Sequence, residues 1–67
     1  MRIILNNREE HIDSNKVTIS ELLMIKNFTF KLLVIKVNGN LIRKPDYPNT
    51  TINEGDDVAI IHLLSGG

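Results

Sequence analysis

The hydrophobic positions of this chain fall into short runs rich in β-branched residues, as is typical of strands. We expect five strands, over residues 1–5, 9–12, 32–37, 41–43 and 58–64. The last run is apolar at nearly every position, which is typical of a strand in the centre of a sheet. Alternation along this strand predicts one face that carries Val58 and Ile60 and another that carries Ala59, Ile61 and Leu63.

One helix is predicted between the second and third strands. Ile19, Leu22 and Leu23 are spaced by three and four residues, so a helix would present them on one side to a sheet. Lys26 extends the same side, and the helix is expected to end near Asn27.

The start of this helix is marked by two agreeing signals. Thr18 and Glu21 form a capping box, in which each side chain accepts a hydrogen bond from a backbone N–H that the helix cannot pair internally. Val17 and Leu22 stand at the positions of a hydrophobic staple across the same cap.

Turn-forming residues separate the strands. Asn6-Asn7 predicts a hairpin between the first two strands, and Asn38-Gly39 suits the positive φ angles of a second hairpin. Pro45 and Pro48 interrupt regular structure, so residues 44–51 are expected to form a surface loop anchored by Tyr47.

The order strand, strand, helix, strand, short strand, strand predicts an α+β fold. A mixed sheet crossed by one helix accommodates it through a single right-handed crossover, in the β-grasp arrangement ββαβ(β)β. In that arrangement the last strand lies beside and parallel to the first. We expect a folded domain over residues 1–64 and a flexible tail, Ser65-Gly66-Gly67, over residues 65–67.

Composition narrows the possible partners and the compartment. Eight basic and eight acidic residues cancel within 67 residues, and the lysines are scattered, so neither nucleic acid nor a membrane is expected as a partner. The chain has no cysteine, and it opens directly on a strand-like segment without the pattern of a signal peptide. We therefore expect a cytoplasmic location.

Side chains that could perform catalysis are few, so no enzymatic activity of its own, bound metal or bound cofactor is expected. His11 and His62 fall on different strands without carboxylates at ligand spacing. Asp56-Asp57 and Glu9-Glu10 would allow a cation site, but a tight turn and a solvated strand explain them at least as well.

The remaining chemical feature is the end of the sequence. A carboxylate on Gly67 would become an electrophile after adenylation, and the glycines Gly66 and Gly67 would let an extended backbone enter a narrow channel of another protein. Residues 65–67 reach only about 10 Å at roughly 3.3 Å per residue, so the folded body must dock as well. We expect Leu63 and Leu64 at the channel mouth.

An exposed apolar patch is predicted on the sheet. If Val58 and Ile60 face the helix, then Ala59, Ile61 and Leu63 face away from it, together with Ile4 of the neighbouring strand. Such a patch is a candidate for partner binding. A second buried layer, made by loops or by self-association, is the alternative.

These features resemble the ThiS family of sulfur carriers in thiamine biosynthesis. Val17-Thr18-Ile19 and Glu21-Leu22-Leu23 are similar to that family's helix start, and the later matches keep the family's order and spacing to the end of the chain. Lys44 and residues 13–16 depart from the family pattern. The later matching stretches are Val37-Asn38-Gly39, Leu41-Ile42, Tyr47, Ile52, Glu54-Gly55-Asp56, Val58 and Gly66-Gly67.

The resemblance implies a ubiquitin-like β-grasp fold and a sulfur-transfer cycle. A ThiF-like adenylating enzyme would use ATP and magnesium to form an acyl-adenylate on Gly67, with Gly66 as the permissive residue before it. Ser65 and the exposed patch would belong to docking. A cysteine desulfurase or another donor would supply sulfur to give a thiocarboxylate, and a ThiG-like thiazole synthase would accept that sulfur.

Three other functions remain open at this point. The small subunit of molybdopterin synthase has the same fold and ending but delivers its sulfur to a pterin. A ubiquitin-like protein modifier would instead form an isopeptide bond to lysines. An interaction domain with an accidental Gly-Gly end would keep its function after deletion of Gly67.

Overall fold

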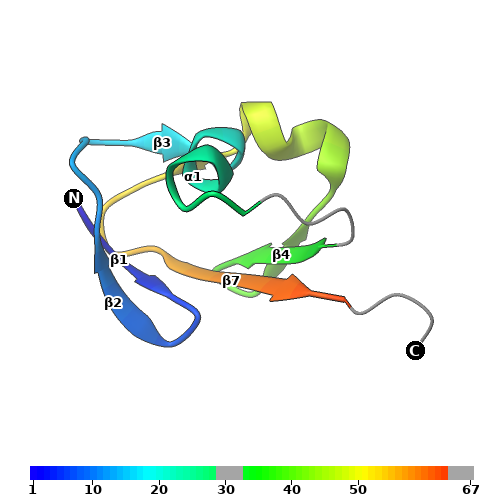
Figure 1. The fold of residues 1–67 in the computed structure, drawn as a ribbon, viewed down its shortest axis with the longest axis horizontal. Coiled ribbons are helices and arrows are strands. Elements are labelled where there is room, and N and C mark those ends of the chain that lie inside the picture. Colours follow the sequence, from blue (N-terminus) through cyan, green and yellow to red (C-terminus); the bar gives the residue numbers. More distant parts are fainter. Residues whose placement is uncertain (29–32, 64–67) are drawn as a thin grey trace.

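The computed structural model describes residues 1–28 and 33–63, which form a five-stranded mixed sheet with one α-helix packed across it (Figure 1). The strands of this sheet lie in the order β2-β1-β7-β4-β5. Their bounds are Arg8–His11 for β2, Arg2–Leu5 for β1, Asp57–His62 for β7, Leu33–Val37 for β4 and Asn40–Ile42 for β5; the helix α1 spans Ile19–Ile25. The predicted α+β, β-grasp fold is confirmed.

The last strand lies in the centre of the sheet. β7 runs parallel to β1, with Leu5 opposite Val58, and antiparallel to β4, with Ile35 opposite Ile60. A strand with a neighbour on each side has both backbone ladders paired, so β7 leaves no edge of its own open. The predicted parallel pairing of the first and last strands is therefore confirmed.

Both hairpins turn through residues in the left-handed region. Asn6 and Asn7 have φ angles of 52° and 67°, and Asn38 and Gly39 have φ angles of 52° and 84°. Two successive residues with positive φ are what a two-residue hairpin turn of the primed type requires, because its twist matches that of the strands. The two predicted hairpins are confirmed.

The helix begins at the predicted capping box. The backbone N–H of Glu21 donates to Thr18 Oγ1 over 3.1 Å, and the backbone N–H of Thr18 donates to Glu21 Oε1 over 2.7 Å. Val17 and Leu22, the two residues of the staple, are both buried. The helix ends at Ile25, and Asn27, just after the C-cap residue Lys26, has a φ of 58°. No helix in the described part of the chain is long and apolar enough to cross a membrane.

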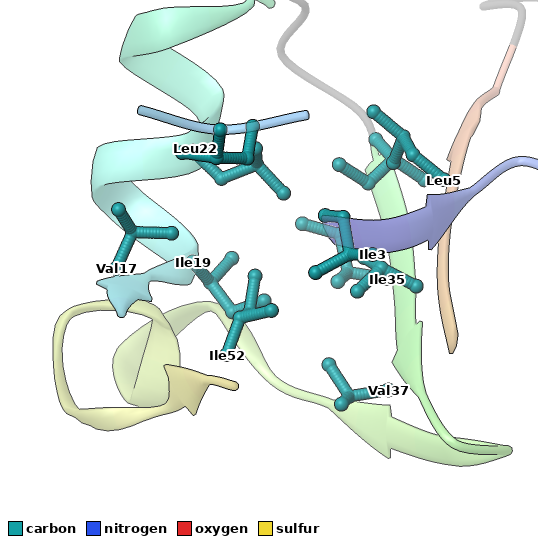
Figure 2. Packing of buried hydrophobic residues seen from close by; sticks show 11 residues of the cluster. Ile3, Leu5, Val17, Ile19, Leu22, Ile35, Val37 and Ile52 are labelled. Carbon is teal, nitrogen blue, oxygen red and sulfur yellow. The ribbon is translucent and has the colours of Figure 1, made fainter. Parts of the chain in front are cut away.

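The core lies between α1 and the helix-facing side of the sheet. Ile19 and Leu22 point from the helix toward Ile3 and Ile35 of the sheet (Figure 2). Among the residues that the structure describes, the buried members of the core are all aliphatic: Ile3, Leu5, Ile12, Val17, Ile19, Leu22, Ile35, Val37, Ile52, Val58 and Ile60.

The prediction of a surface loop over residues 44–51 is wrong. A 3₁₀-helix, η1, spans Lys44–Asn49, and it is followed by a short strand, β6, at Thr51–Ile52. β6 pairs antiparallel with β3, Val17–Thr18, in a second, two-stranded sheet that was not predicted. Tyr47 packs against the core, as expected of an anchor.

Proline is compatible with η1 for a physical reason. A proline near the start of a helix lacks only an N–H that would have no internal partner, and its fixed φ suits the first turn. The N–H of Asp46 donates to the carbonyl of Arg43, and Thr50 Oγ1 donates to the carbonyl of Asp46. These hydrogen bonds stabilise the helix that contains Pro45 and Pro48.

Several strand boundaries also differ from the sequence expectations. The second strand ends at His11, although Ile12 beyond it is buried. The fifth begins at Asn40 and ends at Ile42, and the last begins at Asp57 and ends at His62. The expected start of the third strand at Leu32 and the connection over residues 29–32 lie outside the described residues.

Candidate functional site

One face of the main sheet is not covered by the helix, and several aliphatic residues lie on it. Val58 and Ile60 of β7 are buried beneath α1, whereas Ile61 is 49% exposed and Ala59 is partly exposed. Ile4 of β1 is also partly exposed. The predicted division of β7 into two faces is confirmed by this difference in burial.

Two further residues join this face through strand register. Ile61 lies opposite Val34 of β4, Ala59 lies opposite Lys36, and Lys36 lies opposite Leu41 of β5. Leu41 is 59% exposed. We define the outer face as Ile4, Val34, Leu41, Ala59 and Ile61. Val34 and Leu41 were missed, although alternation along residues 32–37 and the hairpin at Asn38-Gly39 together determine their side of the sheet.

Charged residues lie beside and within the outer face. At one side, Glu9 of β2 lies 3.4 Å from Arg2 and 3.6 Å from His11, measured between side-chain oxygen and nitrogen atoms. Lys36, whose side chain is exposed, lies on β4 between Ala59 and Leu41 and therefore stands among the aliphatic residues. Exposed aliphatic residues with charged neighbours offer both apolar and polar contacts to another protein.

Leu63 lies just beyond the sheet rather than within it. β7 ends at His62, and Leu63, 45% exposed, is the last residue that the structure describes. The predicted site residues Leu64, Ser65, Gly66 and Gly67 lie outside the described residues. Their roles, and the partner-binding role of the outer face, stay predictions.

The carboxylates considered as cation ligands have structural partners. Asp56 Oδ2 accepts from the backbone N–H of Asn53 over 2.8 Å, and Asp56 Oδ1 accepts from the side-chain amide of Asn38 over 3.1 Å. Glu10 pairs with Lys26 of α1 at 2.9 Å. Asp56 therefore holds a turn and Glu10 links the edge strand to the helix.

The histidines do not form a shared site with these carboxylates. His11 lies on β2 and His62 on β7, with β1 between the two strands. Residues 1–28 and 33–63 contain no group of three or more histidine, cysteine, aspartate or glutamate side chains placed to hold a metal ion. In these residues the structure therefore shows exposed aliphatic side chains on the outer face but no cluster of metal-ligating side chains.

Comparisons with known proteins agree with this geometry. The model of the ThiS family matches residues 1–67. A crystal structure of a thiamine biosynthesis protein (ThiS) from Geobacter metallireducens superposes with a TM-score of 0.89 at 22% identity, covering 100% of both chains. An NMR solution structure of a thiamine biosynthesis protein from the same organism gives a TM-score of 0.82 at 22% identity, covering 100% of this chain and 88% of that one. No curated protein matches the chain.

Proposed function

The chain belongs to the ThiS family, and from this premise we propose that it carries sulfur on the carboxylate of Gly67 for thiazole formation in thiamine biosynthesis. Proteins of this family are sulfur carriers and not enzymes. The observation that carries the proposal is the family match, which extends over residues 1–67 and therefore includes Gly66 and Gly67.

The chemistry requires an activated carboxyl group. A free carboxylate is a poor electrophile, so a ThiF-like adenylating enzyme joins it to AMP from ATP, with magnesium, and releases pyrophosphate. The persulfide of a cysteine desulfurase then displaces AMP and forms an acyl disulfide with Gly67, and a thiol cleaves this disulfide to leave a thiocarboxylate on Gly67. A donor that supplies sulfide would displace AMP and give the thiocarboxylate directly. A ThiG-like thiazole synthase takes this sulfur. ATP and magnesium belong to the partner enzyme and not to this chain.

The outer face provides the docking surface in this proposal. Ile61 of β7 and Leu41 of β5 expose apolar area on the same face of the sheet. After β7 the chain continues to Leu63 and then to its last residues. A tail that reaches about 10 Å from residue 64 delivers its carboxylate only if the folded body binds close to the channel mouth. Burying exposed aliphatic side chains against the enzyme stabilises that complex. Leu64 and Ser65 contribute to the same contact.

Separate reconstitutions test this proposal against the related functions. The chain is incubated with the adenylating enzyme, ATP and a sulfur donor, and then with either thiazole synthase or the large subunit of molybdopterin synthase. We expect sulfur to appear in thiazole, and we expect deletion of Gly67 to abolish its formation. Sulfur transfer to the pterin alone would contradict the thiamine assignment, and adducts to lysines of other cytoplasmic proteins would indicate a modifier instead.

A further inference from the structure

A groove opens at the end of the sheet where the chain passes Leu63. Its volume is about 660 Å³, and it lies between the end of α1, the start of β4, β5 and η1. Most of its lining is apolar and comes from segments far apart in the sequence: Leu23, Phe28, Leu33, Ile42, Tyr47 and Leu63.

Two cations stand in the wall of this apolar groove. Arg43 and Lys44 both line it, and both are exposed. Neither forms an ion pair with any residue in the described ranges, whereas Arg2 and Lys26 each pair with a glutamate. The groove therefore combines apolar surface with positive charge that this chain leaves available to a partner.

The groove is continuous with the outer face. Val34 and Leu41 belong to the outer face and also line the groove. Leu63, the last described residue before the tail, lines it as well. A protein that binds the outer face and the tail would therefore also lie next to the groove.

We propose that the groove binds a segment of the adenylating enzyme that carries a large apolar side chain and, next to it, a carboxylate for Arg43 and Lys44. This inference rests on the proposed function, because it takes the adenylating enzyme as the partner. The apolar side chain is buried against Leu23, Leu33 and Tyr47, and the acidic group pairs with the two cations at the border. Apolar contact supplies affinity. Charge complementarity sets the orientation in which the chain binds the enzyme and raises the association rate.

The test compares two double charge reversals by their affinity for the adenylating enzyme. Arg43→Glu/Lys44→Glu changes the groove, and Arg8→Glu/Lys16→Glu makes the same change of net charge at exposed residues that do not line it. We expect the groove variant to bind about tenfold or more weakly and the control variant to stay within about twofold of the parent chain. Raising the salt concentration should weaken the parent complex more than that of the groove variant, because the pairing is electrostatic. Thermal unfolding of all three chains checks that the fold is kept.

A second readout locates the contact directly. In amide NMR spectra of the labelled chain, the enzyme should shift the signals of Arg43, Lys44 and Tyr47 as well as those of the outer face. Equal affinity losses for both double variants would show general attraction to negative charge and overturn the inference. So would unchanged affinity of the groove variant together with unshifted signals of Arg43, Lys44 and Tyr47.

The two proposals fail in different ways. If the parent chain acquires a thiocarboxylate while the groove variant binds like the parent, only the groove assignment is wrong. If the parent chain never acquires a thiocarboxylate, the sulfur-carrier proposal is wrong, and the affinities still decide whether the groove binds the enzyme.

Discussion

Ile61 of β7 and Val34 of β4 lie directly opposite each other on the face of the sheet that α1 leaves uncovered. Their neighbours in sequence, Ile60 and Ile35, form the equivalent pair on the other face, where both are buried. The same two strands therefore supply the core through one set of residues and an exposed apolar surface through the other. This separation allows binding and stability to be altered independently.

Replacing Ile61 should weaken partner binding without unfolding the domain. Ile61→Ser removes exposed apolar area from the outer face, so we expect affinity for the adenylating enzyme to fall about tenfold, as measured by isothermal titration calorimetry. The free energy of unfolding should change little, by about 0.5 kcal/mol or less, as is usual at exposed sites. Met24→Ser is the matched control, because Met24 is 79% exposed on α1, away from the outer face. Equal effects of the two substitutions on affinity would contradict the docking role of the outer face.

Replacing Ile35, which lies opposite Ile60, should instead unfold the domain. Ile35 is fully buried in the core, so Ile35→Ala leaves a cavity and should cost about 2–5 kcal/mol of unfolding free energy. A domain of this size has only a few kcal/mol to lose, so we expect a largely unfolded chain at room temperature by circular dichroism. Val34→Ala, on the other face of the same strand, is the control. A variant Ile35→Ala that melts near the parent temperature would show that the core is not organised as described.

The capping box should contribute measurably to stability. Thr18→Ala removes the acceptor for the Glu21 N–H and should lower the free energy of unfolding by about 1 kcal/mol in urea titrations. Glu21→Ala removes the acceptor for the Thr18 N–H, and the double variant should lose less than the sum of both, since the bonds are reciprocal. Ser20→Ala, in the same helical turn, serves as a control. If the loss of stability in the double variant equalled the sum of the two single losses, the two hydrogen bonds of the capping box would be independent, and the prediction would be wrong.

Asn38 is predicted to hold the second hairpin by both its backbone and its side chain. Its φ is 52°, its amide donates to Asp56, and its side-chain oxygen accepts from the backbone N–H of Asp57 over 2.9 Å. Asn38→Ala should lose about 1–2 kcal/mol in urea unfolding, because it adds strain and removes both bonds. Asn38→Gly loses the bonds but tolerates the φ angle, so it should be the less destabilised variant. The reverse order would mean that backbone strain is unimportant at this turn.

Local signals in the sequence were sufficient for much of the fold. The helix start at Thr18 and the hairpin at Asn38-Gly39 were predictable because capping and positive φ depend on residues close together in the chain. The division of β7 into two faces followed from the strand period of two, and Val58 and Ala59 lie on the expected sides.

Features that depend on distant contacts were not predictable in the same way. β6 is only two residues long, Thr51–Ile52, and exists because Ile52 lies opposite Val17, far away in the sequence. The 3₁₀-helix at Lys44–Asn49 was not predicted because of its two prolines, which exclude most regular structure but are compatible with a short helix that has a proline in its first turn. The groove joins Leu23, Tyr47 and Leu63 from three separate segments, so no local pattern indicates it.

The central claim is that Gly67 carries sulfur, and the mass of the intact chain tests it most directly. The chain is incubated with the adenylating enzyme, ATP, magnesium and a sulfur donor, and its intact mass and that of its last peptide are measured. We predict a mass gain that corresponds to sulfur replacing one oxygen, confined to the peptide that ends at Gly67 and absent without ATP. An unchanged mass of that peptide under conditions in which the enzyme is active on a known carrier would contradict the account.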